Sequence, residues 1–358
     1  MASPEPASRR LLSAKGSLGS LSSFGTILDH ARVIHPVAAR APLRIALGGG
    51  GTDLPSHYRE HGGFVVSAAI DRRVHVTVGP ATSERMRLVH LEREEVEDPA
   101  EIRHPILRAA IARHWNGRPL DLSSVGDVPP GTGLGSSGAY TVCAVKALEA
   151  ASGHDPSPSE LAEAACAIEL GDLGRTVGKQ DQYAAAHGGV NAYTFERDGT
   201  VAVRALELST ETREALRDRF LLFFTGQSRS AAEILADQVE RTLAGDAELL
   251  ENLMRTEELA RAGAAALEDG DLDRMAALLT EQWELKGKRL PHIATPRFER
   301  LRAAALEGGA SGVTMMGAGG GGFLLAYAHE PEAVRIAMEA VGAPELTFDV
   351  DDEGCIAE

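Results

Sequence analysis

Residues 129–137, Pro129-Pro130-Gly131-Thr132-Gly133-Leu134-Gly135-Ser136-Ser137, are the stretch that decides the fold. This glycine-rich loop leads directly into an apolar segment, Ala139 to Ala151, with helical spacing and a closing Gly153. A helix N-terminus presents free backbone N–H groups and a partial positive charge. The stretch therefore predicts a phosphate cradle. An ordinary loop with a serine N-cap is the alternative on the loop alone.

Two further glycine clusters lie far from this loop in the sequence. Gly48 to Gly51 runs into Thr52 and Asp53, and the second cluster is Gly317-Ala318-Gly319-Gly320-Gly321-Gly322. Runs of glycine carry a high entropic cost, so close approach of the backbone to a ligand explains them better than a simple turn does.

Familiar nucleotide patterns do not identify the ligand. GxGxxG is satisfied from Gly133 and again from Gly317, but neither copy precedes a βαβ unit with an acidic residue about 20 positions on. Gly178-Lys179 is followed by Gln180 rather than Ser or Thr, so the Walker A motif is absent there. A dinucleotide-dependent oxidoreductase is therefore disfavoured.

A polar segment follows the second predicted helix, which runs from Pro158 to Leu170. Glu169 ends the apolar part of that helix, and Thr176-Val177-Gly178-Lys179-Gln180-Asp181-Gln182 comes shortly after. Beside a phosphate cradle, these residues suggest one carboxylate for Mg²⁺ and a second for a substrate hydroxyl. A solvated loop with a helix-ending salt bridge is the alternative.

Composition limits the class of protein. The 358 residues favour two domains, and 44% hydrophobic with 25% charged residues is typical of a globular protein. The net charge of -16 argues against a nonspecific nucleic-acid binder. No apolar run reaches the ~18 residues that span a membrane, and three cysteines form no disulfide framework. We expect a cytoplasmic protein with a disordered tail over residues 1–35.

The order of the predicted elements indicates an α+β fold, because strands and helices alternate without a regular βαβ repeat. Strands are predicted at 43–47, 64–70, 74–78, 220–225, 313–316, 323–327 and 346–350, and a hairpin at 191–208 turns at Asp198-Gly199. Helical spacing marks 99–115, and three long helices run through Leu285. The domain boundary is placed near residue 205, giving domains at 36–205 and 206–358.

Three segments together resemble the GHMP kinases, the family of galactokinase, homoserine, mevalonate and phosphomevalonate kinases. They are Ala41-Pro42-Leu43-Arg44 running to Asp53, residues 129–139, and residues 317–323, in the family's order. Within the family, the kinases of D-glycero-D-manno-heptose 7-phosphate are the most similar subgroup, through residues 40–44, 49–55, 178–183 and 225–230. The resemblance implies an N-terminal domain like ribosomal protein S5 domain 2 and a ferredoxin-like C-terminal domain.

The resemblance also implies a role for each motif residue, with ATP and Mg²⁺ as cofactors. Ser137 and Glu169 would hold Mg²⁺, Asp181 would act as base or orient the sugar hydroxyl, and Arg44 would neutralise developing charge. The ATP phosphates would meet Gly131, Gly133, Leu134, Gly135, Ser136, Ser137 and Gly138. The sugar would meet Gly50, Gly51, Thr52, Asp53, Lys179, Gln180, Arg229, Gly319, Gly320 and Gly321.

Two positions depart from the family pattern. Thr314 stands where this subgroup usually carries a lysine, which removes a positive charge near the last glycine loop. Gly138 stands where serine or alanine is more usual, a change expected to be neutral. A 7-phosphate needs basic partners, and the candidates are Lys179, Arg229, Arg72, Arg73, Lys286 and Arg289, of which the first two lie in the subgroup-like segments.

The implied reaction is transfer of the ATP γ-phosphoryl group to the anomeric C1 hydroxyl of a sugar phosphate, giving a 1,7-bisphosphate from the heptose. A C1 kinase for another sugar or sugar phosphate is the second reading. A nucleotide-binding regulator without catalysis is the third, and the presence of Asp181, Glu169, Ser137 and Arg44 argues against it. The expected partner is a small molecule, with neither nucleic acid nor membrane, and the sequence carries no indication of oligomeric state.

Overall fold

A long strand, β2 (Gly63–Pro80), organises the first sheet in the computed structural model, which describes residues 36–358 apart from 117, 228–230, 291–292 and 320. β1 (Val37–Gly48) pairs with it antiparallel along most of its length. The first part of β2 pairs with β6 (Val190–Phe195) and the second part with β5 (Leu120–Gly126). The predicted strands 64–70 and 74–78 are therefore one continuous strand.

The sheet has eight strands in the order β11-β1-β2-β5-β3-β4, with β6 joined to β2 and β7 joined to β6. The remaining strands are β3 (Met86–Val89), β4 (Arg93–Val96), β7 (Val201–Ala205) and β11 (Ile356–Ala357). β6 and β7 are the predicted hairpin. β11 brings the end of the chain back to β1, so residues beyond 205 also contribute to this sheet. The boundary at 205 stays a prediction.

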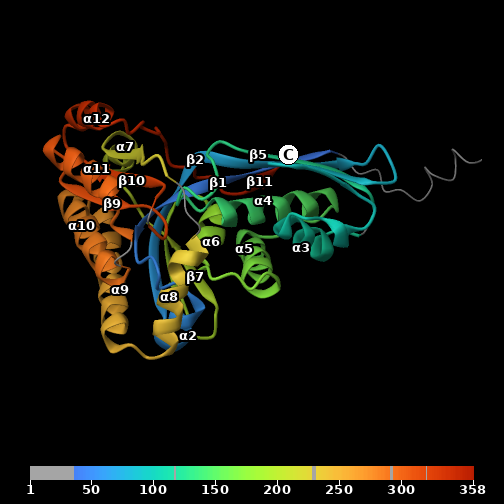
Figure 1. Ribbon diagram of the computed structural model, residues 1–358, viewed down its shortest axis with the longest axis horizontal. Helices are drawn as coiled ribbons and strands as arrows, with labels where there is room; N and C mark the ends of the chain where they lie inside the picture. The colour runs from blue at the N-terminus through green and yellow to red at the C-terminus, as the bar shows by residue number, and fades with distance from the viewer. Residues whose placement is uncertain (1–35, 117, 228–230, 291–292, 320) are drawn as a thin grey trace, which may run out of the picture. The chain divides into compact units, whose positions relative to one another are not determined.

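Four helices lie along one side of this sheet (Figure 1). They are α3 (Pro105–His114), α4 (Ser136–Ala151), α5 (Pro158–Cys166) and α6 (Gln180–His187), and α4 packs on both β1 and β2. α4 is almost wholly buried because its residues are small and apolar on nearly every face. α5 begins with a capping box, in which Ser157 and Glu160 satisfy each other's backbone N–H groups.

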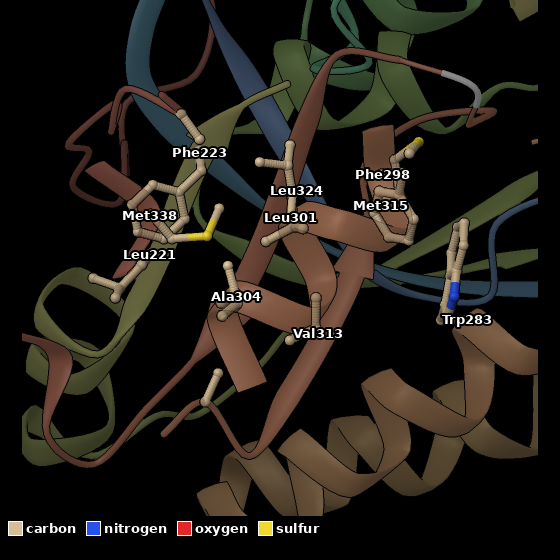
Figure 2. Close-up of a cluster of buried hydrophobic side chains, with 14 of the residues drawn as sticks. Leu221, Phe223, Trp283, Phe298, Leu301, Ala304, Val313, Met315, Leu324 and Met338 are labelled. Atoms are coloured by element: carbon tan, nitrogen blue, oxygen red, sulfur yellow. The ribbon is translucent and has the colours of Figure 1, made fainter. Parts of the chain in front are cut away.

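A second, three-stranded antiparallel sheet has the order β8-β10-β9, formed by β8 (Phe220–Phe224), β10 (Phe323–Tyr327) and β9 (Gly312–Met315). Its core includes Phe223, Leu324 and Met315 from the strands, with Phe298 and Met338 from α11 (Pro296–Glu307) and α12 (Pro331–Ala340) (Figure 2). Three further short helices contribute no residue to this core: α2 (Pro55–His61), the 3-10 helix Pro99–Glu101 and α7 (Thr210–Asp218).

The remaining helices connect the two sheets. They are α8 (Ala231–Leu243), α9 (Ala247–Glu268) and α10 (Leu272–Arg289). α9 packs on β1 and β2, whereas its neighbour α10 packs on β9. This helical hairpin therefore places the C-terminal end of α10 between the sheets.

The predicted α+β class is confirmed, and two local predictions differ. Residues 346–350 make only an isolated bridge, from Val350 to Ile70 on β2, because this segment passes from β8, where Leu346 N donates to the Leu222 carbonyl, to β2 instead of pairing along one strand. The helix predicted from Pro158 to Leu170 ends as α5 at Cys166 and continues as a π-helical turn, Ala167–Asp172. No helix in the described part of the chain is long and apolar enough to span a bilayer. The expected tail, 1–35, lies outside the described residues.

Candidate active site

A cavity of about 450 Å³ brings the three glycine clusters together. It lies between the end of β1, the start of α4, the end of α10 and the loop after β9. Its walls include most of the predicted site residues: Arg44, Gly50, Gly51, Asp53, Gly131, Gly133, Gly135, Ser136, Ser137, Gln180, Asp181, Gly319 and Gly321. Segments separated by more than a hundred residues thus form one site.

The start of α4 is built to receive an anion. Its N-cap is Gly135, in the left-handed region at φ 77°, and no side chain caps the helix. The first backbone N–H groups are therefore left for a ligand. The last glycine loop lies against this one, since a Cβ on Gly317 would come within 2.5 Å of the Gly133 Cα. The two glycine loops meet backbone to backbone, which explains their composition.

Asp181 and Arg44 form the central ion pair of the cavity. Arg44 Nε and Nη2 donate to Asp181 Oδ1 at 2.9 and 2.6 Å, and Arg44 Nη1 donates to the Gly133 carbonyl at 2.6 Å. Arg44, on β1, is buried, whereas Asp181, in the first turn of α6, stays one-third exposed toward the cavity. The pair therefore ties a reactive carboxylate to the phosphate cradle.

Gly138 holds α4 and α6 close together, so the expected neutrality of this position is wrong. A Cβ on Gly138 would lie 2.6 Å from the Asp181 Cβ and 2.9 Å from the Asp181 backbone carbon. Even alanine would push the Asp181 carboxylate away from the start of α4. Gly138 is not among the cavity-lining residues, and its contribution is this close helix contact.

Ser137 and Glu169 meet behind the cradle, as the metal-site prediction requires. Ser137 Oγ donates to Glu169 Oε2 at 2.5 Å, and Gln182 Nε2 donates to Glu169 Oε1 at 2.9 Å. Glu169 is buried within the π-helical turn, a distortion often found at functional sites. Arg175 lies on this pair, with Nη1 2.7 Å from Ser137 Oγ and 3.0 Å from Glu169 Oε2.

This donor set fits Mg²⁺. A hydroxyl and one buried carboxylate are hard oxygen ligands, and Mg²⁺ binds through one or two carboxylates plus phosphate oxygens. The described residues contain no cluster of three His, Cys, Asp or Glu side chains that would hold a metal without a nucleotide. Arg175 neutralises Glu169 in this structure and is a residue that sequence reasoning missed.

Asp53 is a second cavity carboxylate with an unusual environment. Burial raises its pKa, backbone N–H groups of Gln180 and Gly51 lower it, and the nearby Asp181 raises it further. Gly51 N and Gln180 N each donate to it at 3.1 Å. Gly178 must be glycine here, because a Cβ would lie 1.8 Å from Asp53 Oδ2. Asp53 is thus held rigidly between the first glycine cluster and α6.

Several predicted substrate contacts have other partners. Lys179 Nζ is 2.7 Å from Glu163 and donates to the Gly199 carbonyl, so its charge is neutralised away from the cavity. Thr52 is buried and donates to the Gly49 and Phe64 carbonyls. Leu134 is buried in the core, and only its carbonyl takes part, accepting from Arg44 N at 3.0 Å. Arg229 and Gly320 lie outside the described residues.

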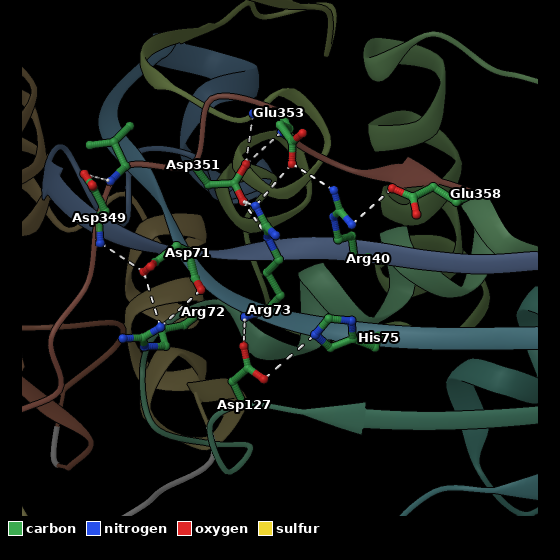
Figure 3. Close-up of polar contacts among 12 residues, drawn as sticks. Arg40, Asp71, Arg72, Arg73, His75, Asp127, Asp349, Asp351, Glu353 and Glu358 are labelled. Carbon is green, nitrogen blue, oxygen red and sulfur yellow. Dashed lines mark hydrogen bonds and ion pairs between the residues drawn. The ribbon is translucent and has the colours of Figure 1, made fainter.

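Arg72 and Arg73 are also excluded as phosphate ligands. Figure 3 shows them on β2 facing the C-terminal segment. Arg73 Nε is 2.7 Å from Asp351 Oδ2, and Arg72 donates to the Thr347 carbonyl. These arginines fasten the end of the chain to the first sheet. Of the six basic candidates, Lys286 and Arg289 line the cavity. Thr314, which stands where the subgroup usually has a lysine, lines it too.

Two family models match the chain: the GHMP kinases N terminal domain over residues 104–189 and the GHMP kinases C terminal domain over residues 264–344. The chain therefore carries both GHMP kinase domains, N-terminal and C-terminal, in the family's order. Members of this family are phosphotransferases that use ATP, so the protein is an ATP-dependent kinase.

Individual relatives differ in the substrates their names state. The D-glycero-alpha-D-manno-heptose 7-phosphate kinase of Campylobacter jejuni is 29% identical over 304 residues, 81% of this chain and 89% of the relative. The mevalonate kinase of Methanothermobacter thermautotrophicus is also 29% identical, over 73% of this chain and 82% of the relative. A crystal structure of a D-glycero-D-manno-heptose 1-phosphate kinase from Bacteriodes thetaiotaomicron superposes with a TM-score of 0.74 at 25% identity, covering 90% of this chain and 98% of that one.

Proposed function

We propose that the protein transfers the γ-phosphoryl group of ATP to the anomeric C1 hydroxyl of a sugar phosphate, with D-glycero-D-manno-heptose 7-phosphate as acceptor. The observation that carries the proposal is the Asp181–Arg44 pair, hydrogen-bonded at 2.9 Å beside the uncapped start of α4. A carboxylate next to a phosphate cradle is the arrangement that phosphoryl transfer to an alcohol requires.

The chain's own residues divide the reaction between them. Both Arg44 contacts go to Asp181 Oδ1, so Oδ2 is the atom assigned to receive the acceptor's hydroxyl proton. The hydroxyl oxygen forms a bond to the γ-phosphorus, and the bond from that phosphorus to the bridging oxygen of ADP breaks. Arg44 and the N–H groups of α4 stabilise the charge that develops on the phosphoryl oxygens.

Ser137 and Glu169 would hold Mg²⁺, which supplies charge neutralisation on the nucleotide phosphates when bound. Gln182 orients Glu169 from the other side through its 2.9 Å hydrogen bond. Asp53 is placed to accept hydrogen bonds from sugar hydroxyls, because it is fixed at the cavity wall beside Gly51.

The choice of acceptor is supported by the Campylobacter jejuni relative, whose name states the heptose 7-phosphate, and by the subgroup-like segments at 49–55 and 178–183. A coupled assay that follows ADP release tests it with a panel of compounds: the heptose 7-phosphate, other sugar phosphates, the corresponding free sugars and mevalonate. We expect the heptose 7-phosphate to give the highest kcat/KM and ³¹P NMR to show a new C1 phosphate.

Each outcome of this screen decides between the readings. A preference for another sugar or sugar phosphate would support the second reading and overturn the proposed acceptor. Turnover of mevalonate alone would place the protein with the mevalonate kinases. No stimulation of ADP release by any compound would favour a nucleotide-binding regulator.

A further inference from the structure

Two basic side chains at the end of α10 line the cavity without a carboxylate partner among the described residues. Lys286 Nζ donates to the Met315 carbonyl at 3.2 Å and to the Gly317 carbonyl. Arg289 is only 4% exposed, and its Nη atoms donate to Asn252 Oδ1, Thr256 Oγ1 and the Gly50 carbonyl at 2.8, 3.1 and 3.0 Å. Its Nε is buried and has no hydrogen-bond partner in the described part of the chain.

Other buried cations of this molecule are neutralised by acids. Arg44 is paired with Asp181, Lys146 with Asp155, and Lys179 with Glu163. Buried charges without an opposite charge are costly, because neutral carbonyls replace only part of the lost hydration. The end of α10 therefore carries an uncompensated positive charge in the ligand-free protein.

The surrounding titratable groups leave Arg289 charged and Lys286 partly charged at pH 7. Burial, then Arg289 and Arg44, lower the pKa of Lys286 to about 7. Burial lowers the pKa of Arg289 to about 10. The neighbouring His57 is neutral at pH 7, because burial, His61 and Arg289 lower its pKa to about 4. A ligand anion is the group that would restore the balance.

The nucleotide phosphates already have their donors on the opposite element, at the start of α4 with Ser137 and Arg44. Lys286 and Arg289 instead donate to the Gly317 and Gly50 carbonyls, in the last and the first glycine clusters, and line the same cavity as Asp53. Gln238 is fully buried and lines the cavity, and its Oε1, which has no partner among the residues that the structure describes, can accept a hydrogen bond from an acceptor hydroxyl.

We propose that Lys286 and Arg289 form an anion subsite that binds the phosphate monoester of the acceptor. The proposal rests on the proposed function in that the acceptor is a phosphorylated alcohol, but it does not require the heptose. Thr314, on β9, stands where the subgroup usually carries a lysine, so this strand supplies no positive charge at that position. Lys286 and Arg289 on α10 would supply positive charge beside the last glycine loop instead.

A structural role alone makes a different prediction. Basic residues in the last turn stabilise a helix through its dipole, and Arg289 also links α10 to α9 and to Gly50. In that case, substitutions would lower stability and would not distinguish a phosphorylated acceptor from its unphosphorylated form. Lys288, in the same turn but exposed, is the matched control.

The test measures dissociation constants by calorimetry with saturating Mg²⁺ and the ATP analogue AMP-PNP. The probes are D-glycero-D-manno-heptose 7-phosphate and the unphosphorylated heptose, together with any phosphorylated acceptor that the screen identifies and its free form. The proteins are the wild type, Lys286→Met, Lys286→Gln, Arg289→Lys and the control Lys288→Met. Melting temperatures show whether each variant folds.

We expect Lys286→Met and Lys286→Gln to weaken binding of the phosphorylated probe about 10- to 100-fold, the loss typical of a hydrogen bond to a charged group. Arg289→Lys should weaken it less, and binding of the free sugar should not change. Lys286→Met should melt no lower than the wild type, because it removes a half-buried charge that has no acidic partner among the described residues. Lys288→Met should bind both probes like the wild type.

Contrary outcomes separate this proposal from the proposed function. A wild type that binds the phosphorylated and free forms equally overturns the subsite and leaves a C1 kinase. Loss of AMP-PNP affinity instead of acceptor affinity assigns Lys286 to the nucleotide and also overturns it. If another sugar phosphate replaces the heptose and its binding depends on Lys286, the subsite stands and the proposed acceptor is wrong.

Discussion

The two walls of the cavity balance their charges in opposite ways. On the wall formed by α4, α6 and β1, Arg44 and Arg175 are paired with Asp181 and Glu169. On the α10 wall, Lys286 and Arg289 are surrounded by carbonyl, amide and hydroxyl oxygens. The first wall is complete without a ligand, whereas the second has an excess of positive charge.

This difference shows how an acidic protein can bind anions. A net charge of -16 describes the whole surface, but a few buried cations dominate the field inside a cavity because the surrounding dielectric is low. In the reaction that we propose, the paired wall positions the reacting groups. The unpaired wall would select the ligand by its charge. The following predictions test whether one wall positions the reacting groups and the other selects the ligand.

The largest effect is expected from Asp181→Asn on the paired wall. The amide keeps the shape of the side chain but cannot accept the acceptor's proton, so kcat should fall by about 10²- to 10⁴-fold, the usual contribution of a general base. Dissociation constants for AMP-PNP, measured by calorimetry, should change little. Turnover close to that of the wild type would exclude Asp181 from proton transfer and orientation.

A smaller loss is expected from Glu169→Gln. The neutral amide removes the proposed Mg²⁺ carboxylate and leaves Arg175 without its partner. The Mg²⁺ concentration for half-maximal activity should rise at least about 10-fold, since even residues that only support metal ligands cost 10- to 100-fold. The control is Asp155→Asn, whose side chain is 90% exposed. An unchanged Mg²⁺ dependence would contradict the assignment.

Gly138→Ala tests the close contact that orders the paired wall. The added methyl group would lie 2.6 Å from the Asp181 Cβ, so α4 and α6 must separate. We expect a loss of about 1–3 kcal/mol in the free energy of unfolding, as for overpacked sites, with a roughly parallel loss of kcat. Denaturant unfolding and steady-state kinetics measure the two effects. Gly171→Ala is the control, because a Cβ there meets nothing within 4 Å.

The smallest effect is expected from pH on the unpaired wall. Lys286 has a pKa of about 7 in the free protein, and a bound phosphate would raise it by favouring the charged form. Binding should therefore take up a proton above pH 7, and affinity for a phosphorylated acceptor should fall several-fold between pH 7 and 9. Calorimetry in two buffers measures this uptake. Lys286→Arg should abolish it, because arginine stays charged.

Much of the paired wall could be predicted from sequence because its residues lie in short, recognisable segments. The loop at 129–137, Glu169 and Asp181 all occur within about fifty residues of each other and are carried by consecutive helices. Glycines at the start of a helix indicate an anion site whatever the rest of the fold does. The same local reasoning failed at Gly138, because the atom that a Cβ would strike belongs to another helix.

Lys179, Arg72 and Arg73 show the limit of reasoning from segment resemblance. Each has the charge that a phosphate site needs, yet Glu163, Thr347 and Asp351 bind them instead. A side chain's partner depends on which element packs beside it, and composition does not contain that information.

Local sequence was thus sufficient for the α+β class and the order of most elements, because periodicity, capping and glycine content act over a few turns of chain. The family resemblance supplied Arg44, Glu169 and Asp181 of the paired wall but not Arg175. Tertiary packing alone decided that Arg175 lies on Glu169 and that α10 places Lys286 and Arg289 at the glycine loops. Those contacts join residues up to 239 positions apart. Their geometry follows from how α9 and α10 pack between two sheets, a long-range outcome that no short stretch of chain encodes.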